Sequence, residues 1–179
     1  MTALRKNCSI IPKKERIVIW HLRQIPYDEG VHVGSRVNAR LKALEEVCRR
    51  VGANVTHQRR EVLRVIVETD SHPDVRTVFR RVRERMPTIS FDTVYRTLSF
   101  LEEHRLISRV RLTGERARFD GNHRLHHHFI CTTCGRIADF ESETLDMMEL
   151  PREATKLGTP AARQLQVFGV CRRCARGED

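Results

Sequence analysis

The chain has 179 residues, of which 40% are hydrophobic and 31% charged, and its formal net charge is +10. This length allows one domain or two small ones with a real core. No apolar run approaches the roughly 20 residues of a membrane span, and no sustained apolar segment or signal-type cleavage site follows the basic N-terminus. We therefore expect a cytoplasmic protein with no membrane partner.

Positive charge is concentrated at the front of the chain. Residues 1–60 contain 13 Lys and Arg against 5 Asp and Glu, whereas residues 121–179 contain 8 of each. This asymmetry favours a polyanion as the partner of the front part, although a basic, solvated tail without a partner is the alternative. Residues 1–34 show no sustained period, so we predict a poorly ordered basic arm there.

Residues 35–120 predict a helical unit that ends in a small hairpin. A helix from Ser35 to a C-cap at Gly52 is indicated by apolar residues at three- and four-residue spacing, namely Val37, Leu41, Leu44, Cys48 and Val51. Three further helices are expected to be capped by Thr56, Asp74 and Ser90. The stretch "LISRVRLTGERARFD" then predicts two short strands. This is the order of elements in a winged helix-turn-helix.

The helix after Ser90, "FDTVYRTLSFLEEHRL", is the candidate recognition helix. If its apolar residues face the core, Thr93, Tyr95 and Arg96 point elsewhere, and an arginine there can read a guanine in the major groove. Flanking phosphates are expected to meet arginines of the wing, namely Arg109, Arg111, Arg116 and Arg118. The alternatives are solvated surface arginines or a protein partner, but the order of elements favours double-stranded DNA.

Four of the six cysteines form two Cys-x-x-Cys pairs, Cys131–Cys134 and Cys171–Cys174. Two such turns can complete a four-thiolate, tetrahedral zinc site that clamps the ends of a small domain together. A pair of disulfides is the alternative, and the lack of a secretory signal argues against it. We expect Cys8 and Cys48 to be unpaired.

Three histidines precede the first cysteine pair in "LHHHFICTTCG". In an extended strand, His126 and His128 point to one face, while His127 and Cys131 point to the other. The pair therefore predicts half of a second metal site, which Asp120, Asp139 and His72 can complete. Nitrogen and oxygen ligands suit Fe(II), Mn(II), Zn(II) or Ni(II). Each of these residues alone would be unremarkable surface polarity, so the prediction depends on the whole set.

The motifs "THQRREVL", "HPDVRTVF", "SFDTVYRTLSFL", "RFD", "HHHFICTTCG" and "FGVCRRC" together resemble the ferric uptake regulator family of metal-dependent transcription factors, over about residues 36–176. The resemblance implies an α+β chain: a winged helix-turn-helix over residues 35–120, then a small α/β dimerisation and metal-binding domain over residues 121–179. It also implies a homodimer that binds an operator when a regulatory metal bridges the two domains. The matching regulatory ligands are His72, Asp120, His126, His128 and Asp139. The matching structural zinc ligands are Cys131, Cys134, Cys171 and Cys174.

Within the family, the chain resembles the peroxide-sensing branch, because both oxygen positions, Asp120 and Asp139, are Asp rather than Glu. In that branch bound Fe(II) reacts with peroxide and ligand histidines are oxidised, which here match His72 and His126; Mn(II) is the less reactive alternative. We therefore expect a repressor rather than an enzyme. An iron- or zinc-uptake regulator is the alternative, and a metallohydrolase is a remote one that would leave the basic front unused.

Two departures from the family pattern stand out in the second domain. Leu125 and Arg163 occupy positions where some iron regulators have ligands of an additional metal site, so we do not expect that site here. Pro151 falls where the family usually has an uninterrupted dimerisation helix, and proline is poorly tolerated inside a helix.

Overall fold

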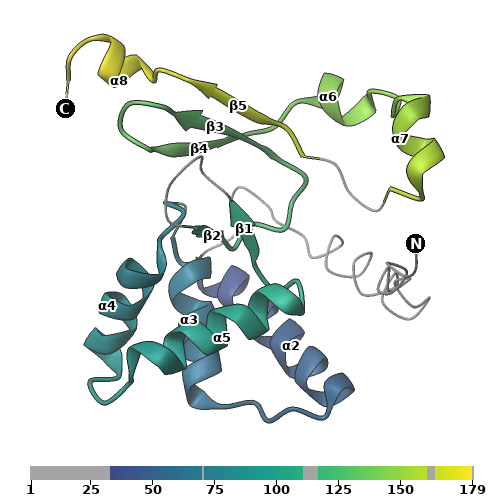
Figure 1. The fold of residues 1–179 in the computed structure, drawn as a ribbon. Helices are drawn as coiled ribbons and strands as arrows, with labels where there is room; N and C mark the ends of the chain where they lie inside the picture. The colour runs from purple at the N-terminus through teal and green to yellow at the C-terminus, as the bar shows by residue number, and fades with distance from the viewer. Residues whose placement is uncertain (1–32, 70, 111–116, 161–163, 179) are drawn as a thin grey trace, which may run out of the picture.

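The structure is a computed structural model that describes residues 33–69, 71–110, 117–160 and 164–178. Its first part, here called the helical unit, contains α2 (Val33–Val51), α3 (His57–Val67), α4 (Val75–Arg85) and α5 (Phe91–Glu103). These helices are followed by β1 (Ser108–Val110) and β2 (Arg118–Asp120), which pair antiparallel (Figure 1). The predicted winged helix-turn-helix is thereby confirmed, although the tip of the wing, including Arg111 and Arg116, lies outside the described residues.

The three predicted caps are confirmed. Thr56 accepts a hydrogen bond from the backbone N–H of Arg59 (3.2 Å), and the side chains of Asp74 and Ser90 accept from the third residue of α4 and α5 in the same way. Each satisfies an N–H that has no partner within the helix. The helix expected from Ser35 begins at Val33.

Two details of the predicted helices were wrong. Helix α5 ends at Glu103 rather than continuing to Leu106, because Arg105 adopts a left-handed backbone (φ +56°) that turns Leu106 into the core. Val51 was expected to face the core but is 43% exposed. It is the last residue of α2 and is followed by Gly52 (φ +68°), where the chain turns away; Val47 occupies the buried stripe instead.

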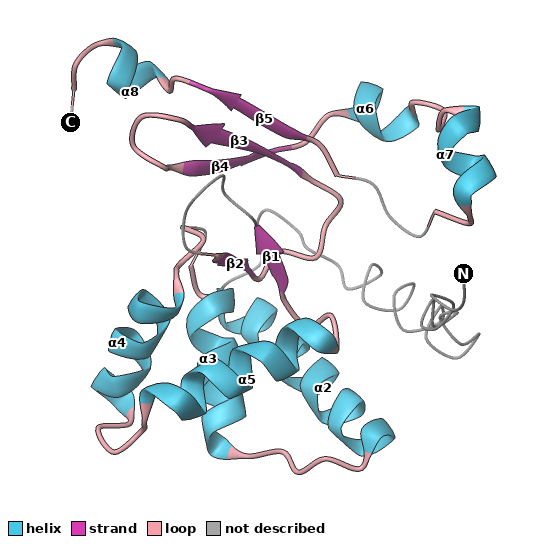
Figure 2. Cartoon of the chain, viewed as in Figure 1, coloured by secondary structure: helices cyan, strands magenta, loops and turns pink. Residues whose placement is uncertain are grey.

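The remaining elements form the sheet unit, which lies over the β1–β2 hairpin on the side away from the helices (Figure 1). It consists of β3 (His127–Cys131), β4 (Ile137–Phe140), α6 (Glu143–Met147), α7 (Arg152–Leu157), β5 (Gln166–Gly169) and α8 (Arg172–Ala175). The strand order is β4-β3-β5, with β3 antiparallel to β4 and parallel to β5. Helices α6 and α7 lie beyond one end of the sheet and α8 beyond the other (Figure 2).

The two units differ greatly in their apolar cores. Nineteen buried residues from α2–α5, the loops between them and β2 form one cluster in the helical unit. Among the residues that the structure describes, the other cluster has three members, Val110 of β1, Ile130 of β3 and Ile137 of β4, and it joins the hairpin to the sheet. The sheet unit therefore depends on something besides apolar burial for its stability.

Pro151 divides the region where the family resemblance implied one long helix. Pro151 is the residue immediately before α7, and the fixed φ of proline is compatible with the start of a helix. Large apolar side chains of α6, α7 and β5 are exposed, including Met147 (77%), Leu157 (91%) and Phe168 (46%). Among the described residues, no helix is both long and apolar enough to cross a bilayer.

Candidate metal centres

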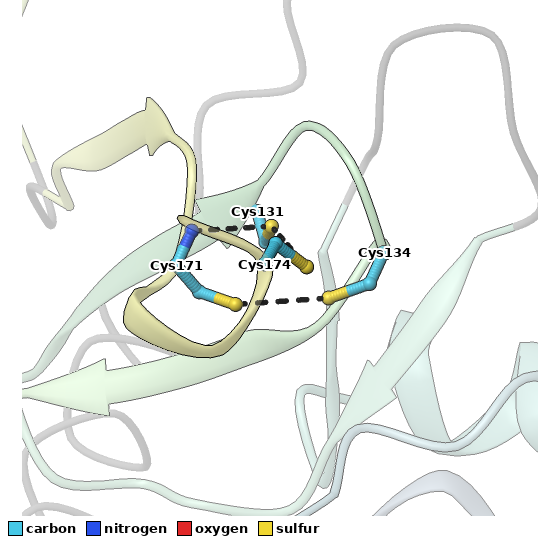
Figure 3. Close-up of side chains that lie close together, drawn as sticks. All are labelled: Cys131, Cys134, Cys171 and Cys174. Carbon is cyan, nitrogen blue, oxygen red and sulfur yellow. Dashed lines mark hydrogen bonds between the residues drawn. The ribbon is translucent and has the colours of Figure 1, made fainter. Parts of the chain in front are cut away.

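Four cysteines meet where β3, the following turn and α8 come together. Cys131 ends β3, Cys134 lies in the turn to β4, and Cys171 and Cys174 belong to the cap and body of α8 (Figure 3). The Sγ atoms of Cys131 and Cys174 are 3.9 Å apart, as are those of Cys134 and Cys171. Four sulfurs bound tetrahedrally to zinc stand about 3.8 Å apart, given Zn–S bonds of about 2.3 Å. All four thiols are free, so the disulfide alternative has no support.

The protonation of these thiols also fits a bound cation. Backbone N–H groups of Cys134 and Cys171 lower the pKa of the Cys131 thiol to about 6, and the Cys171 N–H lies 3.3 Å from its sulfur. The neighbouring Cys171 and Cys134 side chains raise the pKa of Cys174 to about 12. Four thiolates cannot form together at neutral pH without a positive charge among them, and a divalent ion supplies it.

A second cluster lies where the helical unit meets the sheet unit. Ligand atoms of His72, His126, His128 and Asp139 all lie within 4.8 Å of one another. Asp120 belongs to the same place, since its Oδ2 is 3.0 Å from Nε2 of His126. The structure thus brings together all five side chains that the sequence grouped, and the histidines are at most 3% exposed.

Local backbone geometry delivers each of these side chains. His72 adopts a left-handed conformation (φ +48°) before Pro73, which is unusual for a residue with a Cβ and is typical of functional sites. Antiparallel pairing of β3 with β4 places His128 opposite Asp139. Asp120 ends β2. The loop before Pro73 therefore provides His72, and the end of β2 provides Asp120. The sheet side provides the other three, His126, His128 and Asp139.

Hydrogen bonding orients the His126 imidazole toward the cluster. Nδ1 of His126 lies 2.8 Å from the Arg124 carbonyl oxygen and donates to it, so Nε2 faces the cluster. Nδ1 of His72 is buried without a hydrogen bond. Nε2 of His72 and Nε2 of His126 are buried as well, and each lies 3.0 Å from a carboxylate oxygen, of Asp139 and Asp120 respectively. Buried polar atoms rarely remain without a partner, and a metal ion is a partner that suits an imidazole lone pair. The residues present therefore fit a divalent ion.

The charges of the cluster lead to the same conclusion. Burial lowers the pKa of His126, but its contact with the Asp120 carboxylate more than offsets this and raises the pKa to about 9. Burial raises the pKa of Asp139, but hydrogen bonds from His128 and His72 hold it well below its usual range. Without a metal, a proton on His126 therefore balances the carboxylates, and an incoming cation must replace it.

Several supporting residues were not anticipated from the sequence. Ser108 donates a hydrogen bond to Asp120 (3.2 Å), as does the backbone N–H of Asn122 (2.7 Å). The side-chain amide of Gln164 lies 2.9 Å from Nε2 of His128. The strand register places Ser108 opposite Asp120, so correct strand pairing would have found it. No sequence signal marks Gln164.

His127 lies apart from both clusters. Its Nε2 is 3.3 Å from Asp146 of α6, and its Nδ1 lies 3.2 Å from the backbone N–H of Leu165. As the alternation of strand faces predicted, it does not join the flanking histidines.

The candidate DNA-binding residues vary in exposure. Tyr95 is 52% exposed, and the Arg96 side chain is 80% exposed with an ion pair to Asp92 (2.8 Å). Thr93 is half-buried because its backbone N–H and hydroxyl contact the capping Ser90. Arg109 is ion-paired with Glu102 of α5. Their contacts with DNA stay predictions.

Comparisons with known proteins identify the family of this chain. The sequence profile described as "Ferric uptake regulator family" matches residues 50–163. The chain belongs to the ferric uptake regulator family. A peroxide-responsive repressor, PerR, from Staphylococcus epidermidis is 30% identical over 127 residues, which are 70% of this chain and 84% of that protein.

Solved structures of the ferric uptake regulator family share this fold. The ferric uptake regulator of Helicobacter pylori aligns with a TM-score of 0.66 at 23% identity, over 80% of this chain and 96% of that one, and this likeness bears on the fold alone. A zinc uptake regulator in complex with zinc and DNA aligns with a TM-score of 0.55 at 27% identity, over 79% of this chain and 97% of that one. Members of the family are transcription regulators and not enzymes, which removes the metallohydrolase alternative.

Proposed function

We propose that this chain is a metal-dependent, DNA-binding transcriptional repressor whose regulatory site responds to peroxide. The observation that carries the proposal is the cluster of His72, Asp120, His126, His128 and Asp139, whose members come from both units. An ion held by both sides favours one relative orientation of the units. Shifting a population from 1:99 to 99:1 requires that orientation to bind the ion about 5.5 kcal/mol more strongly.

The DNA-binding part of the proposal rests on α5 and the wing. Tyr95 and Arg96 are exposed on α5, and the solved zinc uptake regulator with DNA offers a precedent for operator binding on this fold. Arg96 already pairs with Asp92, so reading a base would require that surface ion pair to open, at a cost of about 0–1 kcal/mol.

The homodimer rests on the uncovered apolar surface of the sheet unit. Strand β5 lies at the edge of its sheet, and Leu165, Phe168 and Val170 are 41%, 46% and 54% exposed. A second copy of the chain would cover these side chains together with those of α6 and α7. Two copies would also present two α5 helices to an operator with two half-sites.

The four-thiolate cluster is assigned a structural zinc ion, and the histidine–carboxylate cluster is assigned Fe(II) or Mn(II). Bound Fe(II) would supply the electrons that reduce peroxide, whereas Mn(II) reacts with it much less readily. The chain contributes buried imidazoles at the reacting position. The rings of His72 and His128 lie 5.0 Å apart edge to face, and those of His126 and His128 lie 4.7 Å apart, so an oxidant formed there meets histidine first.

Peroxide sensing is favoured over metal uptake by two observations. Both carboxylate positions are Asp, and the Staphylococcus epidermidis relative, at 30% identity, is a peroxide-responsive repressor. An uptake regulator on the same scaffold is the second candidate, supported by the zinc uptake regulator at 27% identity.

The deciding experiment compares the Fe(II)-loaded and Mn(II)-loaded proteins after the same brief exposure to peroxide. We expect the iron form to gain one oxygen on His72 or His126 and to release its operator, while the manganese form keeps both. Peptide mass spectrometry and an operator gel shift on the same samples provide the measurements. An iron form that keeps its DNA with both histidines unmodified would leave the uptake regulator as the better proposal.

A further inference from the structure

A cavity of about 430 Å³ separates the helical unit from the cysteine turn and is not explained by either metal cluster. One wall is the end of α3 and the loop after it, including Thr69, Ser71 and His72. A second is Arg118 of β2, and the third is the turn that carries Cys134 and Arg136. A volume in the range of about 300–1,000 Å³ is typical of small-molecule sites.

The charges around this cavity favour an anion. Within residues 33–69, 71–110, 117–160 and 164–178, neither Arg118 nor Arg136 has an ion pair. Glu68, the acidic residue of the wall among those that the structure describes, is paired with Arg85 at 2.9 Å. Arg118 and Arg136 line different walls of the cavity, and arginine is the side chain best suited to bind a carboxylate or phosphate group.

Neutral donors complete the lining. The hydroxyl oxygens of Thr69 and Ser71 lie 2.6 Å apart, which uses one hydroxyl proton and leaves the other available for a ligand. The His72 side chain is 2% exposed and points away into the histidine–carboxylate cluster. The cavity therefore adjoins the regulatory cluster without sharing its ligand atoms.

We propose that this cavity binds a small dianion, either a dicarboxylate or inorganic phosphate, between Arg118 and Arg136. Arg118 belongs to the helical unit and Arg136 to the sheet unit, so the ligand bridges the same two units as the regulatory metal. If the metal works by closing the units together, which is the function proposed above, the anion and the metal favour the same orientation. Each then raises the affinity for the other by the same factor.

Binding is tested first without any regulatory metal, on the full-length, zinc-loaded protein. Isothermal titration with succinate and with inorganic phosphate is expected to give saturable binding of one of these probes per chain, and the probe that binds identifies the source. Arg118→Gln and Arg136→Gln should each weaken it about tenfold or more, since each removes a charged, two-pronged partner. Arg152→Gln, an exposed arginine of α7, is the matched control and should leave the affinity unchanged. Zinc content and circular dichroism verify that each variant is folded.

Two results would overturn the proposal. One is the absence of saturable binding for both probes, and the other is an equal loss in Arg152→Gln, which indicates only attraction to a basic protein. Since no regulatory metal is present, failure of peroxide sensing would not affect these readouts.

The coupling has its own test. Mn(II) affinity, followed by electron paramagnetic resonance, should rise about threefold to tenfold when the bound anion is saturating. Arg136→Gln at the same anion concentration corrects for chelation of Mn(II) by free anion and should show no rise. If the anion binds but the Mn(II) affinity is the same in wild type and Arg136→Gln, the proposed coupling is wrong. The proposed anion site would then still stand.

Discussion

Removal of the zinc ion is expected to unfold the sheet unit while the helical unit stays folded. The two units are expected to respond differently because their apolar cores differ in size. Within the described part of the chain, the helical unit buries nineteen residues in its apolar cluster, whereas the cluster that supports the sheet consists of Val110, Ile130 and Ile137. The four cysteines tie together the end of β3, the turn before β4 and the segment after β5.

The zinc ion decides whether the sheet unit stays folded, because apolar burial alone does not offset the conformational entropy lost when the strands become ordered. The three strands contain 5, 4 and 4 residues, and ordering their backbone costs about 1–2 kcal/mol per residue, or roughly 20 kcal/mol in all. Burying three aliphatic side chains contributes about 5–9 kcal/mol. A structural zinc ion contributes about 10–16 kcal/mol, which brings the two sides to within a few kcal/mol of each other. Without zinc, the strands lack more than half of their stabilisation.

Hydrogen exchange with peptide-level mass spectrometry provides the measurement. After chelation of zinc, or in Cys131→Ser, residues 127–140 and 164–176 should lose protection, whereas α3 and α5 should retain it. Cys48→Ser is the control, because Cys48 is buried in the helical core and distant in sequence from the zinc turns. Zinc-free protein that keeps full protection in β3 would refute the reasoning, as would a simultaneous loss of protection in both units.

Three further predictions concern the other elements. The affinity for Mn(II) should rise with pH up to about 9, because the metal displaces the proton held by His126, whose pKa is raised to about 9. Loss of one proton limits this rise to about tenfold per pH unit. An affinity that does not change between pH 7 and 8.5 would contradict this. Arg96→Ala should weaken operator binding by about 1–3 kcal/mol and relax base preference in gel shifts, whereas Arg152→Ala should not; equal effects of the two changes would argue against a base contact. Asp74→Ala should lower the free energy of unfolding in urea by about 1 kcal/mol, since the Thr77 N–H loses its partner at 2.7 Å, and an unchanged midpoint would exclude the cap as a stabilising contact.

Local rules predicted much of this fold. Helix caps could be found because Thr56, Asp74 and Ser90 act on backbone groups only three residues away. The separation of His127 from its neighbours followed from strand alternation alone. The errors at Val51 and at the end of α5 arose at element ends, where the backbone of Gly52 and Arg105 turns left-handed and periodicity no longer applies.

The candidate metal clusters were predicted as sets of residues but not as geometry. Within each cysteine pair, the short Cys-x-x-Cys spacing already brings the two thiols together. The four-cysteine cluster therefore requires only that the two pairs approach each other. The histidine–carboxylate cluster requires a strained His72, the β3–β4 register and the wing to converge, and no local pattern specifies their mutual distances. Gln164 escaped prediction because its partner His128 is far away in sequence.

Strand β3 carries His128 near its start and Cys131 at its end, three residues later, or about 10 Å along an extended chain. A single short strand thus holds ligands of both clusters, so oxidation of one cluster has different consequences from oxidation of the other. Under the proposed function, oxidation of a histidine would remove one ligand and leave the strand in place, so the chain would stay folded but no longer close. Oxidation of the thiolates would release the strand itself, and the histidines would then lose the scaffold that aligns them. The first event would be a loss of metal at an intact fold, whereas the second would unfold the sheet unit.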